Sequence, residues 1–158
     1  MKKLLILLIL AIACALVLNA GTPLPSGTIK IPPDKPVFTV EASESWKAEY
    51  VEGSGVLGLD AKDDSVNMSI GPSGGVSITE DTAKEALLKE ALATWSGAKN
   101  TEPDELTVAG HKAYHTKLTT TLGDVDYTIV TPDGKSFFTI GVTKGDAKAI
   151  IASIKPAP

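Results

Sequence analysis

The sequence contains no arginine, because all 15 of its basic residues are lysines. It therefore lacks the planar guanidinium group that binds phosphates and carboxylates through two parallel hydrogen bonds. The formal net charge is −4, whereas nucleic-acid-binding domains usually carry a basic surface. Aromatic residues are also scarce, at 5%, so the core is expected to be aliphatic. These absences exclude nucleic acid as an expected partner.

Cysteine occurs once, as Cys14 in a hydrophobic leader. The rest of the chain therefore has neither a disulfide framework nor a thiolate metal site. Histidine occurs twice, as His111 and His115. The two residues fall on a predicted strand, where four residues span about 13 Å. One metal ion cannot bind both side chains at that separation, so no metal-binding residue is predicted.

Three other groups of residues were considered as chemical sites. Residues 71–75 read Gly-Pro-Ser-Gly-Gly, but the histidine and aspartate of a serine-protease triad would have to precede this serine. Asp60, Asp63 and Asp64 lack the alternating ligands of a calcium loop. Asp124 and Asp126 share a strand face and could form a carboxylate pair, although a charged solvent face is the ordinary interpretation. We therefore expect no catalytic residue and no cofactor.

The N-terminus has the layout of a secretory signal. Met1-Lys2-Lys3 precedes an uninterrupted apolar run over residues 4–18, which is a short positive start followed by a hydrophobic segment. Residues 1–20 are therefore interpreted as a signal peptide, a lipoprotein signal or an N-terminal anchor. The protein is expected to be exported to a periplasmic or other extracytoplasmic location.

Three fates of this leader remain open. Residues 11–14 resemble a bacterial lipoprotein box, in which Cys14 would receive the lipid. Ordinary cleavage after Ala13 or near Ala20 is the second alternative. The third is an uncut anchor, because residues 4–20 reach the lower limit of a bilayer-spanning helix. The first and third alternatives would attach the domain to a membrane.

Residues 21–36 contain five of the ten prolines in the chain, at positions 23, 25, 32, 33 and 36. Proline-rich chain favours an extended conformation of about 3 Å per residue. This segment is therefore predicted to be a linker, and the folded domain is predicted to cover residues 37–155.

The domain is predicted to have an α+β fold, with a central antiparallel sheet built from two meanders and helices packed on its faces. Alternating apolar residues predict the first meander at 37–41, 46–51, 56–59 and 65–70, and the second at 105–108, 112–122, 125–131 and 135–143. Between the meanders, helical periodicity over residues 83–95 predicts that Ala86, Leu87, Ala91 and Leu92 pack on the sheet. A second helix is predicted at 147–154.

The order of these elements resembles that of PsbP-like domains. A tryptophan, Trp46, follows the first strand, and Gly110-His111-Lys112-Ala113 is similar to the Gly-x-x-Ala that opens the long central strand in that family. The chain closes on a helix that ends in Ser153-Ile154-Lys155, as such domains do. The family includes exported and lipid-anchored bacterial proteins such as the DcrB-type lipoproteins. The resemblance implies a sheet covered by helices and a role in binding partners, with no shared catalytic residues.

Together these observations predict an exported, membrane-tethered module of the cell envelope that binds an envelope protein or a small ligand and is not an enzyme. Two alternatives remain. One is a small envelope hydrolase or metal-dependent enzyme that uses His111, His115 or the aspartates. The other is a binder of small apolar ligands between the sheet and a helix.

Overall fold

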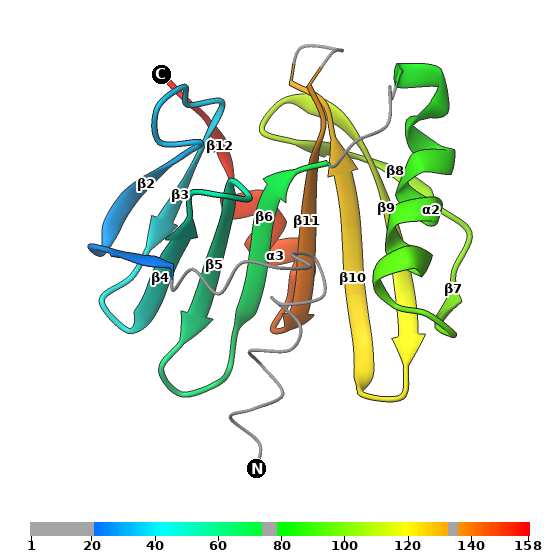
Figure 1. Cartoon of the computed structure of the whole chain (residues 1–158), viewed down its shortest axis with the longest axis horizontal. Helices are drawn as coiled ribbons and strands as arrows, with labels where there is room; N and C mark the ends of the chain where they lie inside the picture. Colours follow the sequence, from blue (N-terminus) through cyan, green and yellow to red (C-terminus); the bar gives the residue numbers. More distant parts are fainter. Residues whose placement is uncertain (1–20, 74–78, 133–135) are drawn as a thin grey trace.

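The computed structural model describes residues 21–73, 79–132 and 136–158. Cys14, with the whole predicted leader, and the last two residues of the serine loop, as we call residues 71–75, lie outside this part of the chain. Strands account for 50% of the structure and helices for 16%. The predicted α+β class is therefore wrong, and the fold is dominated by antiparallel sheet (Figure 1). The two α-helices are short, at 12 and 7 residues.

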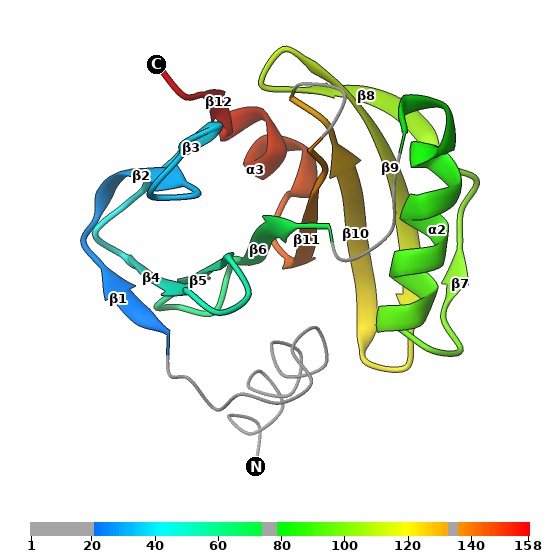
Figure 2. The ribbon, with the colours of Figure 1, turned by 45° about the horizontal axis from the view of Figure 1, so that its top comes forward.

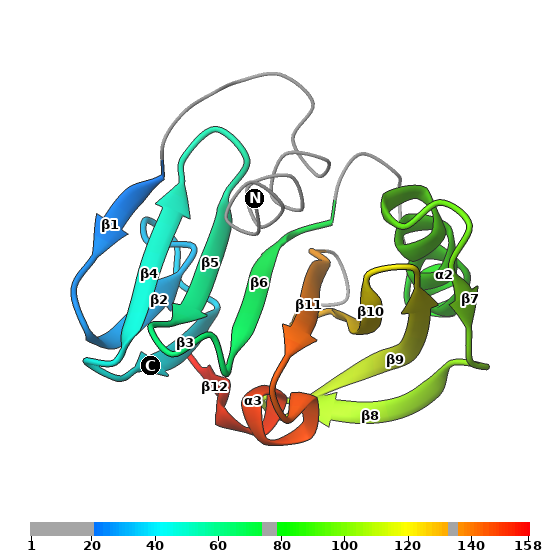
Figure 3. The same cartoon turned by 90° about the horizontal axis from the view of Figure 1, so that it is seen from below.

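Within the described residues, nine strands form one antiparallel sheet. Its order is β1-β4-β5-β6-β11-β10-β9-β7, with β8 paired to the same strand, β9, as β7. Figure 3 shows this order across the sheet. The strands are β1 (Thr22–Leu24), β4 (Trp46–Val51), β5 (Val56–Ala61), β6 (Asn67–Pro72), β11 (Phe138–Lys144), β10 (Gly123–Val130), β9 (His111–Thr120), β7 (Lys99–Asn100) and β8 (Asp104–Val108). The predicted second meander is confirmed as β8 to β11.

A smaller sheet joins the two ends of the described chain. It consists of β12 (Lys155–Pro156), β3 (Phe38–Ala42) and β2 (Gly27–Ile31), in that order. The first predicted strand of the first meander, β3, therefore belongs to this sheet and not to the central one. The linker predicted at 21–36 is also wrong, because β1 and β2 lie within it. Its prolines hid the alternation of buried Ile29 and Ile31 with exposed Thr28 and Lys30.

The helices lie on opposite faces of the large sheet (Figure 2). A short 3-10 turn, η1 (Glu80–Thr82), leads into α2 (Ala83–Thr94), which packs on β9 and β10 through buried Ala83, Leu87 and Ala91. Leu92 was expected to be buried with them, but it is 38% exposed. The second helix, α3 (Ala147–Ser153), packs on the other face together with the small sheet.

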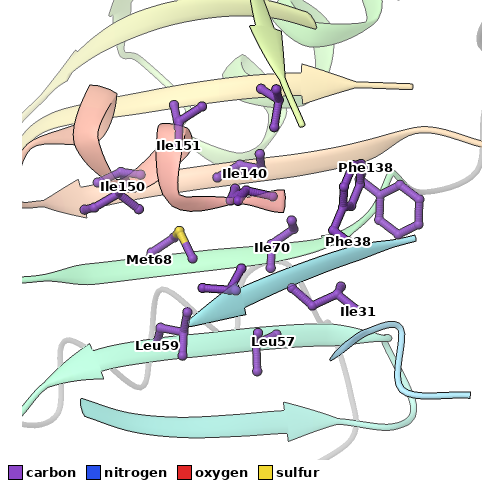
Figure 4. Close-up of a cluster of buried hydrophobic side chains, with 14 of the residues drawn as sticks. Ile31, Phe38, Leu57, Leu59, Met68, Ile70, Phe138, Ile140, Ile150 and Ile151 are labelled. Carbon is purple, nitrogen blue, oxygen red and sulfur yellow. The ribbon is translucent and has the colours of Figure 1, made fainter. Parts of the chain in front are cut away.

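The main core fills the space between the small sheet, α3 and the large sheet (Figure 4). It is mainly aliphatic, as expected from the low aromatic content, and Phe38 and Phe138 make an edge contact at 5.4 Å between ring centres. Its buried side chains include Ile31, Leu57, Leu59, Met68, Ile70, Ile140, Ile150 and Ile151. In the part of the chain that the structure describes, neither helix is long and apolar enough to span a membrane.

Candidate functional site

The candidate site is a histidine held between two aspartates on three neighbouring strands. The Nδ1 atom of His115 lies 2.8 Å from Oδ1 of Asp104, and its Nε2 atom lies 2.8 Å from Oδ1 of Asp126. The His115 side chain is 16% exposed, that of Asp126 is 26% exposed and that of Asp104 is 67% exposed. We call these three residues the Asp–His–Asp triplet.

Strand register places the three side chains on one face. Asp104, the first residue of β8, pairs with His115 on β9. On the other side of β9, Asp126 of β10 pairs with Lys117, one step along the same face. The neighbours of His115 in sequence, Tyr114 and Thr116, point to the opposite face because side chains alternate along a strand. His115 therefore reaches both adjacent strands.

Each contact of the triplet needs one proton between its two atoms. An ionised carboxylate can only accept hydrogen bonds, and a neutral imidazole carries a single N–H. Both contacts are therefore hydrogen bonds only when both nitrogens are protonated or one aspartate carries the proton. The hydrogen bond with His115 lowers the pKa of Asp104 below its ordinary value, and this effect exceeds the opposing effect of partial burial.

A second charged pair continues the same face. Lys117 forms an ion pair with Asp124 at 2.9 Å, and the Thr119 hydroxyl donates to the same carboxylate at 3.1 Å. The hydrogen bond with Lys117, followed by that with Thr119, lowers the pKa of Asp124. The hydrogen bond with Asp124 raises the pKa of Lys117. We call the triplet and this pair together the polar face of β8 to β10.

Several residues that the sequence suggested as members of one site have different partners in the structure. Asp124 bonds Lys117 while Asp126 bonds His115, so the two aspartates do not act as a carboxylate pair. His111 packs edge-on against Phe38, with ring centres 6.2 Å apart, and takes no part in the triplet. In the three described ranges, no group of three or more histidine, cysteine, aspartate or glutamate side chains is arranged to bind a metal ion.

The remaining acidic residues have structural partners. Asp60 accepts a hydrogen bond from the Asn67 amide, and Asp64 forms an ion pair with Lys144. Asp63 accepts from both the backbone and the hydroxyl of Ser65, which closes the turn between β5 and β6. They are turn and edge charges, as the sequence suggested. The hydroxyl of Ser73, in the described part of the serine loop, bonds Glu90 on α2.

Asp104 is the functional candidate that the sequence analysis missed. It directly precedes the second meander, which was predicted to begin at residue 105. The signal was nevertheless present, because a two-residue turn at Ala109-Gly110 pairs Val108 with His111. Counting back along both strands then pairs Asp104 with His115, as the structure shows. The register could thus have been derived from the turn alone.

Comparison with known proteins supports the fold. A scan against family models and a search of curated proteins gave no match. Among solved structures, the cyanobacterial PsbP (CyanoP) of Synechocystis sp. PCC 6803 is similar, with a TM-score of 0.57 and 14% identity over 89% of this chain and 95% of that chain. LpqN of Mycobacterium tuberculosis, described as involved in cell envelope biogenesis, gives a TM-score of 0.49 and 13% identity over 87% of this chain and 90% of that one.

The match to CyanoP covers most of both chains, so it concerns the overall fold and not a single motif. At this level of identity it establishes the arrangement of the backbone. It agrees with the resemblance seen in Gly110-His111-Lys112-Ala113 and in the closing helix. The described chain therefore has a fold similar to that of CyanoP.

Proposed function

We propose that this protein is an exported module of the cell envelope that binds a partner and does not catalyse a reaction. The observation that carries this proposal is that both nitrogens of His115 are in contact with aspartates. Both nitrogens of the imidazole face carboxylates at 2.8 Å, so neither is directed toward a substrate. A general base must reach the proton that it abstracts, and His115 is already occupied on both sides.

The polar face of β8 to β10 is the surface that we propose for the partner. It carries three aspartates, Asp104, Asp124 and Asp126, against one lysine, Lys117, and a histidine. Complementary charge steers association and fixes the orientation of a complex. The excess of carboxylates on this face favours a basic segment of a neighbouring envelope protein.

The predicted leader supports the export part of the proposal. The fold limits how far the domain could lie from its point of attachment. Because β1 starts at Thr22, only residues 15–21 would separate a lipid on Cys14 from the folded domain. Fully extended chain over that interval reaches at most about 28 Å. A tethered domain would thus sit close to the membrane surface, and its partner would have to be membrane-proximal as well. Such confinement raises the effective concentration of neighbours.

The proposal is tested by comparing two matched ion pairs on different surfaces. The Lys117–Asp124 pair lies on the polar face and the Lys84–Glu102 pair joins α2 to the loop before β8, both at 2.9 Å. Cells would carry the normal chain, a Lys117→Ser, Asp124→Ser variant or a Lys84→Ser, Glu102→Ser variant. We expect cross-linked partners to be lost only from the first variant.

Two results would contradict the proposal. If both variants capture the partner equally, the polar face is not the surface that binds it. A hydrolytic or metal-dependent activity that disappears in a His115→Gln variant, while the variant remains folded, would support the enzymatic alternative instead.

A further inference from the structure

We infer that the Asp–His–Asp triplet is a proton-operated latch, which holds Asp104 against β9 when the imidazole is doubly protonated and releases its carboxylate when one proton leaves. This inference deepens the function proposed above, because it adds a regulation to the same face. It rests on the two hydrogen bonds of His115 and on the unequal burial of the two aspartates.

The proton count sets the two states of the latch. With both nitrogens protonated, each carboxylate receives one N–H at 2.8 Å. After one proton is lost, one bare nitrogen faces a carboxylate oxygen, and two lone pairs cannot remain at hydrogen-bonding distance. Charge-assisted bonds are the stronger ones, so the change replaces an attraction by a repulsion. One of the two contacts must open.

Burial decides which contact opens. Asp126 lies in the middle of β10, between β9 and β11, and its side chain is only 26% exposed. Thr128, which pairs with His115 in the same register, is fully buried and its hydroxyl has no hydrogen-bond partner. Solvent therefore has little access on that side. Asp104 is 67% exposed at the first position of β8, so its carboxylate turns into water at little cost.

The charges around the triplet also favour opening of the contact between His115 and Asp104. On the face of His115, β9 contributes His111 and Lys117, β8 contributes Asp104, and β10 contributes Asp124 and Asp126. Lys148 of α3 lowers the pKa of Asp104 further, although less than His115 does. Lys117 is already paired with Asp124. The charge of Lys148 therefore favours the ionised form of Asp104.

The opening is local because non-titrating bonds hold the preceding residues. The Thr101 amide donates to the Lys117 carbonyl at 2.9 Å, and the Thr116 hydroxyl donates to the Thr101 carbonyl at 2.8 Å. The Lys117 amide donates to the Thr101 hydroxyl at 3.0 Å. The release of Asp104 thus frees a carboxylate on the polar face and loosens the start of β8, while Thr101 stays bonded to β9. A cationic side chain of a partner would gain this carboxylate only in the open state.

The test uses the purified protein without any partner, so that its failure would leave the proposed function standing. Imidazole nitrogen signals of His115 are followed by NMR during a pH titration, together with amide exchange across β8. We expect two hydrogen-bonded N–H groups at low pH and loss of the Nδ1 proton first as the pH rises. Exchange of the β8 amides, corrected for intrinsic rates, should accelerate about two- to five-fold at that step, as for a pair with one exposed member.

Two variants decide between the latch and a passive contact. In Asp104→Asn, the amide can accept from a protonated nitrogen or donate to a bare one, so the step in β8 exchange should disappear. Asp124→Asn changes another aspartate on the same face that does not touch His115, and it should keep the step. Loss of the Nε2 proton first, or β8 exchange that is unchanged across the titration of His115, would overturn the inference.

Discussion

Individual side chains on the large sheet are positioned by their neighbours on adjacent strands. Tyr127 shows this on the face covered by α2. Its strand partner is Gly141, and a Cβ there would lie 3.7 Å from the Tyr127 ring and 3.3 Å from the Ser69 hydroxyl. Burial raises the pKa of Tyr127, and the hydroxyl bonds Thr139 and Thr94. A side chain at Gly141 would thus crowd the Ser69 hydroxyl, while its Cβ would make only an ordinary contact with the Tyr127 ring.

A single side chain, Asp104, is expected to make the free energy of unfolding depend on pH. Its folded-state pKa is lowered, first by the hydrogen bond to His115. Such a group stabilises the fold above its unfolded pKa of about 3.9, and this contribution is lost as the pH falls through the lower folded value.

Asp104→Ala should therefore lower the free energy of unfolding near pH 6 by about 0.2 to 1 kcal/mol, the range for a pair with an exposed partner. The difference should vanish near the acid end of a series of urea titrations. An equal loss at every pH would mean that the residue acts through packing and not through its charge.

The helix α2 carries two leucines that were both predicted to pack on the sheet, but only one of them is buried. Leu87 is fully buried in a cluster with Ile129 and Phe137, whereas Leu92 is partly exposed. A helix touches a sheet along one side only, so only residues that point directly at β9 and β10 lose contact with water. Periodicity predicts which residues lie on one side of a helix, but not how much of that side the sheet covers.

The two positions provide a matched test. Leu87→Ala should lower the free energy of unfolding by about 2 to 5 kcal/mol, because it removes a buried side chain and leaves a cavity. Leu92→Ala should change it by less than about 1 kcal/mol. Denaturant unfolding measures both values, and similar losses for the two variants would contradict the packing of α2 on β9 and β10.

The strand β2 is the element that the sequence analysis assigned to a linker. Prolines on both sides indicated extended, unpaired chain, and the two buried isoleucines between them were too few to show a clear period. The pairing of β2 with β3 depends on residues distant in sequence, which local patterns do not reveal. By contrast, the hairpin of β8 and β9 has a two-residue turn and clear alternation, and it was predicted correctly. The other two strands of the second meander were also predicted, although their observed bounds differ from the expected ones.

A pair of substitutions in β2 tests this correction. Ile31 is almost fully buried and Lys30 is exposed. Ile31→Ala should therefore reduce the free energy of unfolding by about 2 to 5 kcal/mol, while Lys30→Ala should leave it within about 0.5 kcal/mol. If thermal and denaturant unfolding show no effect of Ile31→Ala, the segment behaves as the linker first predicted.

For the whole molecule, the attachment of the chain is still a prediction from its leader. If Cys14 is lipidated, Cys14→Ser should abolish incorporation of labelled fatty acid and release the protein from membranes. Fractionation and intact mass spectrometry measure both effects. A mature chain that begins at Gly21, or one that still begins with Met1, would instead support ordinary cleavage or an uncut anchor. With β1 starting at Thr22, cleavage near Ala20 would leave almost no chain outside the sheet.

The three-stranded sheet determines when this chain can fold. Its middle strand, β3, pairs with β2 from the beginning of the described chain and with β12 from its end. The main core likewise combines Ile29 and Ile31 with Ile154. This core therefore closes only after segments that are distant in the sequence have met, and such contacts form slowly. Until Ile154 has been synthesised this core cannot be completed, so the growing chain stays easier to unfold, which is what passage through a narrow translocation channel would require.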